Sequence, residues 1–288
     1  MGSTTASREM WTADGVELTT YGYNITSFAY VAPTLKGTSL TLPMRSGSLP
    51  RYNRSYEPGE FGLSMWVLGA EPDGDVPASW TLQRGQFETN LRLLMSVLCK
   101  QSAPIAFSKT LHDSSVITSR ATPTPETASM ETQMGRLRGE VTFTFELIDS
   151  FWTETTQRTS TATAGATLPK TLALTAYSGS TAPLEDAVVT VSGPITNPRV
   201  TDAESGSWVQ YTGSVPNGQN WVVDCGLFTS KVNGVSVRTS TSHGGHPRFL
   251  YIPPRYGTTA IPSLQLTGSA GGAATNLSVA YKRKFLLP

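Results

Sequence analysis

The stretch NWVVDCG places an acid beside a thiol, Asp224 and Cys225, inside an otherwise apolar run. Trp221, Val223 and Cys225 alternate, so they share one face of an expected strand, and the thiol is expected to pack in a core as a small hydrophobe. Asp224 ends that strand just before a glycine, where a carboxylate accepts backbone N–H groups and fixes a turn. These two residues therefore indicate the end of a strand and not a catalytic site.

The three histidines could supply the remaining nucleophile or metal chemistry. The possible thiol–imidazole pairs are Cys225 with His243 or His246, and Cys99 with His112. Free cysteines, however, are usually buried packing residues. His243 and His246 have a spacing that suits a metal, but no Cys, Asp or Glu close by in sequence supplies further ligands. Glycines and a proline mark a loop there, so we expect two exposed loop histidines. We predict no catalytic residues, no metal, no cofactor and no enzyme activity.

The charge balance argues against a nucleic-acid or membrane partner. Charged residues make up 15% of the 288 residues and the net charge is +1, whereas soluble domains usually carry about 25% charged residues. Such a chain has no strong field to attract phosphate groups. The run YKRKF, from Tyr281 to Phe285, is interpreted as an edge strand whose cations discourage pairing. No phosphate-binding, dinucleotide or metalloprotease motif occurs.

Targeting signals are not visible in the sequence. The first residues, MGSTTASREMWTADG, lack the apolar run of a secretory signal. No run approaches the roughly 18 apolar residues that a membrane helix needs. Two cysteines in separate regions are not a disulfide framework. We therefore expect synthesis in the cytoplasm and no membrane association.

Periodicity divides the chain into two β-rich regions. In the first, Asp14-Gly15 is the favoured two-residue hairpin turn, and GEVTFTFEL alternates as a strand. One helix is predicted at about 79–100 because its apolar residues follow a helical stripe. The stripe consists of Phe87, Leu91, Leu94, Met95 and Leu98.

The second region shows short strands with regular turn signals, which is typical of a β-sandwich. Between the regions, TQRTSTATAGATLPK has no period. We predict a first domain at 1–158, a linker or crossing segment at 159–183 and a second domain at 184–288. The predicted fold class is mainly β.

The order of several motifs resembles the distal tail proteins of long-tailed bacteriophages, and most closely the minor tail proteins of actinobacterial phages. The motifs are DGVELTTYGYNITS, LTLPMRSGSLPRYNRSYEPGEFGLSMWVLG, NLRLLMSVL, GEVTFTFELIDSFW, VSGPITNPRV, WVVDCG and AYKRKFLLP. The resemblance covers nearly the whole chain, and it rests on the order and spacing of the motifs.

The resemblance implies a structural virion protein at the distal end of the tail. Such proteins form a hexameric ring that adapts the tail tube to the tail-tip hub and leaves a lumen for DNA and the tape-measure protein. Their N-terminal belt domain is a β-sandwich with a helix and an extended hairpin, and their C-terminal domain is a galectin-like β-sandwich. The expected partners are further copies of the chain, the tube protein, the hub or tail-associated protein and the tape-measure protein.

The turn-rich segment of about 43–60 is the predicted extended element that neighbouring subunits share. Its Tyr and Arg content is what interfaces favour, and an ordered surface loop is the alternative. The predicted interface residues are Arg45, Leu49, Tyr52 and Tyr56.

Two other functions stay open at this point. A carbohydrate-binding module would need an exposed aromatic platform, for which Trp208 and Trp221 are the candidates. A tail-tube subunit is the weaker alternative, because the second all-β region argues against it.

Overall fold

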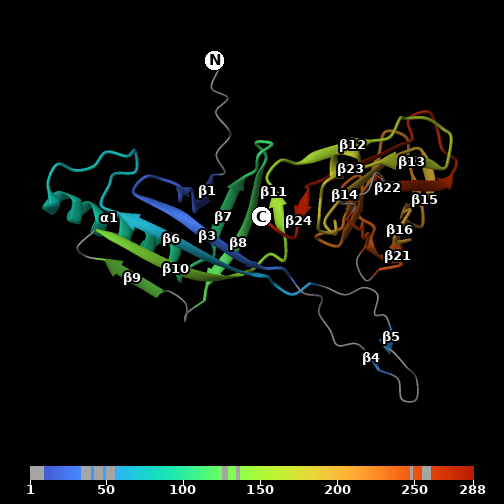
Figure 1. Cartoon of the computed structure of the whole chain (residues 1–288). Coiled ribbons are helices and arrows are strands. Elements are labelled where there is room, and N and C mark those ends of the chain that lie inside the picture. Colours follow the sequence, from blue (N-terminus) through green and yellow to red (C-terminus); the bar gives the residue numbers. More distant parts are fainter. Residues whose placement is uncertain are drawn as a thin grey trace. The chain divides into compact units, whose positions relative to one another are not determined.

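The computed structural model describes residues 10–33, 40–41, 48–49, 56–124, 129–133, 137–246, 249–254 and 261–288 (Figure 1). The chain forms two compact units, one made of Met1–Thr155 with Leu286–Pro288 and the other of Thr156–Phe285. In the described residues the protein is mainly β, with one α-helix and antiparallel sheets. The predicted fold class is therefore confirmed.

The segment 159–183 is not a linker, and that expectation is wrong. It contains most of β12 (Arg158–Thr161) and all of β13 (Lys170–Ala173). These strands pair with β23 (Asn276–Tyr281) and β22 (Ser263–Ser269) inside the second unit. Both lie at sheet edges, and among their residues only Leu172 is buried. A strand that buries only one side chain shows no alternation of apolar and polar residues, so its sequence does not predict a strand.

The first unit is built on one antiparallel sheet with the order β2-β1-β7-β8-β10-β6-β3, to which β9 adds on β10 and β11 on β8. The strands are β1 (Trp11–Ala13), β2 (Val16–Glu17), β3 (Tyr23–Val31), β6 (Glu60–Leu68), β7 (Ile105–Thr110), β8 (Val116–Pro123), β9 (Ser129–Gln133), β10 (Arg138–Leu147) and β11 (Trp152–Glu154). The β1–β2 turn is the predicted one, because Asp14 and Gly15 have φ of 48° and 82°.

This sheet folds over itself at β8. Residues 116–121 of β8 pair with β7, whereas only Ala121–Pro123 pair with β10. The two halves face each other across an aromatic core. The Phe61 ring from β6 meets the Phe107 ring from β7 edge-on, with centroids 5.0 Å apart. The buried alternation of β10 is the predicted one, and its buried residues are Val141, Phe143, Phe145 and Leu147.

The helix α1 (Trp80–Leu98) agrees with the predicted helix and packs against β6. Ser79 caps it, since its side chain accepts the Leu82 N–H. The predicted stripe is partly wrong, because Met95 is 37% exposed while the polar Asn90 is buried. The Asn90 amide Nδ2 donates to the carbonyls of Leu68 and Ala70, at 2.9 and 2.8 Å. The periodicity of apolar residues could not predict the burial of Asn90, because it takes no account of hydrogen-bonded polar side chains.

Within the long connection between β3 and β6, two short strands pair with each other. β4 (Leu40–Thr41) and β5 (Ser48–Leu49) form an antiparallel two-stranded sheet of their own, in which Leu40 is the register partner of Leu49. The described part of this connection is therefore a hairpin, in agreement with the extended hairpin of the predicted fold.

The second unit is a β-sandwich. One sheet has the order β12-β23-β14-β18-β19-β20, and the other has the order β13-β22-β15-β16-β21 with β17 on β15. The strands not yet bounded are β14 (Val188–Ser192), β15 (Ile195–Asp202), β16 (Trp208–Tyr211), β17 (Ser214–Val215), β18 (Asn220–Asp224), β19 (Thr229–Val232), β20 (Val235–Ser236) and β21 (Thr241–Gly244). The short β24 (Lys284–Phe285) and the 3₁₀ turns at Thr175–Tyr177 and Arg238–Ser240 complete this unit.

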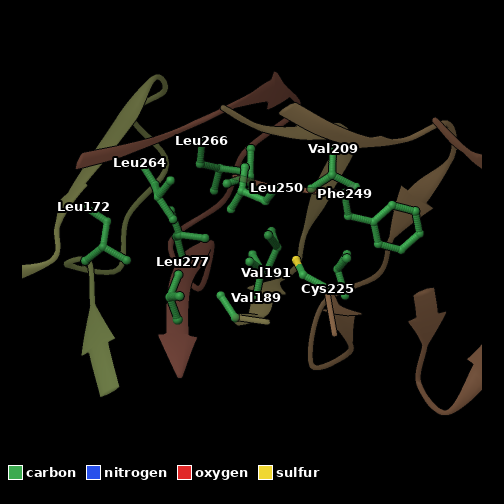
Figure 2. Close-up of a cluster of buried hydrophobic side chains, with 14 of the residues drawn as sticks. Leu172, Val189, Val191, Val209, Cys225, Phe249, Leu250, Leu264, Leu266 and Leu277 are labelled. Atoms are coloured by element: carbon green, nitrogen blue, oxygen red, sulfur yellow. The ribbon is translucent and has the colours of Figure 1, made fainter. Parts of the chain in front are cut away.

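The core of the second unit consists of inward-facing aliphatic and aromatic side chains from both sheets. Figure 2 shows part of this cluster, with Val189 and Val191 from one sheet and Leu264 and Leu266 from the other. The run YKRKF was expected as an edge strand, which is wrong for Tyr281, because it ends β23 and is buried between β12 and β14 in the sheet order. Lys284 and Phe285 form β24, which has only one described strand partner. The Tyr281 ring packs edge-on against the ring of Tyr177. Burial of this large aromatic side chain in the core is more favourable than its exposure at a sheet edge.

Candidate functional site

The acid and thiol of the NWVVDCG stretch have the structural roles predicted for them. Cys225 is fully buried, and Figure 2 shows its sulfur directed into the core cluster. Burial raises the pKa of this thiol to about 12, so the nucleophilic thiolate does not form at neutral pH. The Asp224 carboxylate accepts the Leu227 N–H at 2.8 Å and holds the turn after β18.

The two histidines of the TSHGGH stretch differ from the expectation of exposed loop residues. His243 lies in β21 and its ring packs edge-on against the buried Phe249, with centroids 5.3 Å apart. His246 is 9% exposed and stacks on the Tyr251 ring at 4.4 Å. Both rings have aromatic partners, so neither histidine is exposed; His243 lies in a strand and His246 in the bend that follows it.

The remaining elements of a possible catalytic or metal site are not brought together. Cys99 is the C-terminal cap of α1 and half-buried, and burial raises its pKa. His112 lies in an exposed turn. In the described ranges, no group of three or more His, Cys, Asp or Glu side chains is placed to hold a metal ion. Among the same residues, no helix has the length and hydrophobicity to span a bilayer.

Neither of the two tryptophans considered for sugar binding is an exposed aromatic platform. Trp221 is fully buried, and its indole N–H donates to Ser230 Oγ at 2.8 Å. Trp208 is half-buried on the outer face of its sheet, with the Arg199 guanidinium stacked 4.2 Å from the ring centroid. The ring also packs against Gly244, where an added Cβ would lie 2.8 Å from indole atoms. Stacking of a sugar on Trp208 would first require Arg199 to move.

The predicted interface residues lie in or next to the β4–β5 connection. Arg45 and Tyr52 fall outside the described residues. Leu49 belongs to β5, where its backbone pairs with Leu40. Tyr56 is half-buried, and its ring packs edge-on against Phe151 with centroids 5.0 Å apart. Their role as an interface stays a prediction.

An open strand edge, which the sequence reasoning did not identify, stands out in the first unit. β3 has nine residues and pairs with β6 on one side, while on its other side no described strand pairs with it. Its sequence, YNITSFAYV, holds neither a charged residue nor a proline. Natural edge strands are usually protected by shortness, charge, proline or a bulge, because a free edge pairs readily with another chain. β3 has only the bulge between Ile25 and Ser27.

A second open edge lies on the opposite side of the same half of the sheet. β10 pairs with β6 along nine residues, and β9 pairs with the first half of β10 on its other side. No further described strand pairs with β9. Within the larger sheet, the order β9-β10-β6-β3 therefore has an edge without a described strand partner at β3 and another at β9, while β8 pairs with the last residues of β10. The signal for β3 in the sequence is its richness in aromatic and β-branched residues, but the bulge breaks the alternation that would reveal it.

Comparisons with known proteins support the fold. No family model and no curated protein matches the sequence. Among solved structures, the chain is similar to the SPP1 Dit (gp 19.1) protein, described as a paradigm of the hub adsorption apparatus in phages that infect Gram-positive bacteria. The similarity covers 96% of this chain and 99% of that chain, with a TM-score of 0.56 and 14% sequence identity. The chain therefore has a Dit-like fold over nearly its full length.

Proposed function

We propose that the chain is a structural distal tail protein of a phage virion and not an enzyme. It assembles as a hexameric ring at the distal end of the tail tube, adapts the tube to the tail-tip hub and leaves a lumen for DNA. Its partners are other copies of itself, the tube protein, the hub or tail-associated protein and the tape-measure protein. The infection of actinobacteria stays a prediction from the sequence resemblance.

The observation that carries this proposal is the pair of strand edges without a described partner, at β3 and at β9, in a chain of Dit-like fold. A closed ring uses heterologous contacts, in which one patch of a subunit meets a different patch on its neighbour. The β3 edge and the β9 edge are two such patches on one subunit, and pairing β3 of one copy with β9 of the next repeats around a ring. Main-chain hydrogen bonds then supply the contact.

The β4–β5 hairpin would add area to the same contact. A permanent ring needs well over ~1,000 Å² of buried surface per contact, and main-chain pairing along one strand edge does not by itself bury that much. Among the predicted interface residues Arg45, Leu49, Tyr52 and Tyr56, the arginine and the tyrosines are of the types that interfaces favour. We therefore assign this connection to the ring interface next to the strand edges.

Imaging of virions labelled with an antibody to this chain tests the proposal. Label confined to the distal end of the tail is the expected result. Label along the whole tail would identify a tail-tube subunit, and the absence of label from virions would contradict any virion role.

The carbohydrate-binding alternative has less support, because the two candidate indole rings are covered by protein groups. A glycan array with the purified chain and with Trp208→Ala separates the two functions. Binding that is lost in Trp208→Ala would favour a receptor-binding module.

A further inference from the structure

One sheet of the second unit has an outer face with a single charged residue. In the sheet of order β13-β22-β15-β16-β21 (Figure 1), residues that point into the core alternate with outward residues that are half-buried or exposed. The outward residues at 171–173, 199–201, 208–210, 242–244 and 263–267 are Ser, Thr, Gln, Ala or Gly, apart from Arg199 and Trp208. Along these described strands the outer face therefore has one cation and no carboxylate.

Neighbouring residues hold the Arg199 side chain in place. Its guanidinium carbon lies 4.2 Å from the centroid of the Trp208 ring. The two residues are diagonal neighbours, because Arg199 pairs with Gln210 and Thr201 pairs with Trp208. The register of β15 against β22 shifts just before Arg199, and such irregularities re-aim side chains. The indole packs closely on Gly244, where any Cβ would collide with it, so the position of the ring is fixed as well.

The charge of Arg199 has no carboxylate partner among the described residues. The ion pairs there join other side chains, and no Asp or Glu pairs with Arg199. Arg120 of the first unit differs, because its guanidinium donates to both Asp149 carboxylate oxygens, at 3.0 and 2.9 Å. A guanidinium stacked on a ring keeps its N–H groups in its own plane, where they can donate to an oxyanion. Arg199 is therefore preorganised to bind an oxyanion of another molecule.

The surroundings of Arg199 select the class of molecule that supplies the oxyanion. Nucleic acid needs several cations for binding of any strength, and this face has one. A sugar needs an exposed aromatic ring, whereas Trp208 is half-buried with Arg199 stacked on it. The centres of protein interfaces, in contrast, are depleted in charged residues and enriched in Arg and aromatic residues, and Arg and Trp are frequent hot spots. The composition of the outer face therefore favours a protein partner.

We propose that this outer face is a docking surface for an acidic segment of another virion protein, and that Arg199 donates two parallel N–H bonds to a carboxylate of that segment. The planar fork of an arginine matches the two oxygens of a carboxylate. Thr201 and Gln210 lie beside Arg199 and Trp208 in the register and supply a hydroxyl and an amide for the remaining polar groups of the segment. This inference rests on the proposed virion role, but it does not depend on the ring contact of the first unit.

Binding of poly-L-glutamate to the full chain tests the site in solution. Arg199→Gln removes the charge, and Lys231→Gln is the matched control, because it removes an exposed cation from the other sheet of the same unit. We expect Arg199→Gln to bind at least about tenfold more weakly than the wild type, and Lys231→Gln to bind as the wild type does. Arg199→Lys keeps the charge without the fork and should stay at least about fivefold weaker. Equal losses in Arg199→Gln and Lys231→Gln, or full binding by Arg199→Lys, would overturn the proposal. Circular dichroism checks that each variant is folded.

Suppressor selection in the phage tests the class of partner. Arg199→Glu places like charges opposite each other, so we expect the infectious titre to fall at least about tenfold, whereas Lys231→Glu should leave it unchanged. Second-site mutations that restore the titre should replace an Asp or Glu of another virion protein by Lys or Arg. An unchanged titre of Arg199→Glu, or suppressors confined to this chain, would overturn the proposal. Failure of the virion role itself is recognised separately, because the antibody would then leave virions unlabelled.

Discussion

The edge strands of the two units differ in how well they are protected. The second unit ends its sheets with short strands: β12, β13 and β21 have four residues each and β20 has two. Two of these carry a cation, Arg158 in β12 and Lys170 in β13. The first unit leaves a nine-residue, uncharged edge open at β3. Because natural proteins avoid such edges unless another chain covers them, we place the proposed ring contact in the first unit.

The largest expected effect comes from placing positive charges on the β3 edge. Thr26→Lys with Ala29→Lys places two lysines at exposed positions of β3. Lysines on an edge strand oppose pairing with a second chain, so we expect the ring to weaken by at least about tenfold or to be lost. Light scattering of the purified variant over a range of concentrations measures this.

The matched control puts the same charges on edge strands of the second unit, as Thr171→Lys with Ser242→Lys at exposed positions of β13 and β21. This variant should assemble as the wild type does. If it loses the ring while the β3 variant keeps it, the assignment of assembly to the first unit is wrong.

A second prediction concerns how the first unit holds its helix. Asn90→Ala removes the donor to the Leu68 and Ala70 carbonyls and leaves the buried Ala70 carbonyl and the partly buried Leu68 carbonyl without that partner. Each such loss costs about 1–3 kcal/mol, so we expect the free energy of unfolding to fall by about 2–4 kcal/mol. Urea denaturation followed by circular dichroism measures this. Thr89→Ala, on the exposed side of α1, should change it by less than about 0.5 kcal/mol, and an equal effect of both variants would contradict the role of Asn90.

A third prediction concerns a buried hydroxyl pair beside the hydrophobic core of the second unit. Ser230 accepts the Trp221 indole N–H, and its oxygen lies 2.7 Å from Thr241 Oγ1. Ser230→Ala leaves the buried indole N–H without an acceptor, which should lower the free energy of unfolding by about 1–3 kcal/mol. The exposed Ser242→Ala is the control for the same urea experiment. Neither variant should change assembly, and loss of the ring in Ser230→Ala with the fold retained would argue against separate roles for the units.

The smallest effect is a pH-dependent one at the end of α1. Lys100 Nζ lies 2.8 Å from Asp14 Oδ2, and the Ala106 N–H donates to Oδ1 at 2.9 Å. Both lower the pKa of Asp14. The stabilisation is therefore present above the pKa of the unfolded chain and is lost as the pH falls through the lower folded pKa. Asp14→Asn should cost no more than about 1 kcal/mol at pH 7, and the difference should vanish in acid. A difference that persists at low pH would contradict the ion pair.

Residue patterns predicted much of the fold but little of the candidate site. The Asp14-Gly15 turn, α1 and the alternation of β10 follow directly from local chemistry, and Cys225 is in the core as expected. Asn90 and the two histidines could not be placed, because their environment is made by residues distant in sequence. β3 was missed for a related reason. Its bulge shifts the alternation, and an open edge is a property of the sheet order, which a single sequence does not reveal.

Backbone hydrogen exchange of the chain, as a dilute monomer and as the assembled ring, tests the central claim most directly. The account predicts that assembly slows exchange along β3 and β9, while exchange at β12, β13, β20 and β21 of the second unit stays unchanged. Exchange that stays fast along β3 in the assembled protein, with new protection on the strands of the second unit, would contradict it.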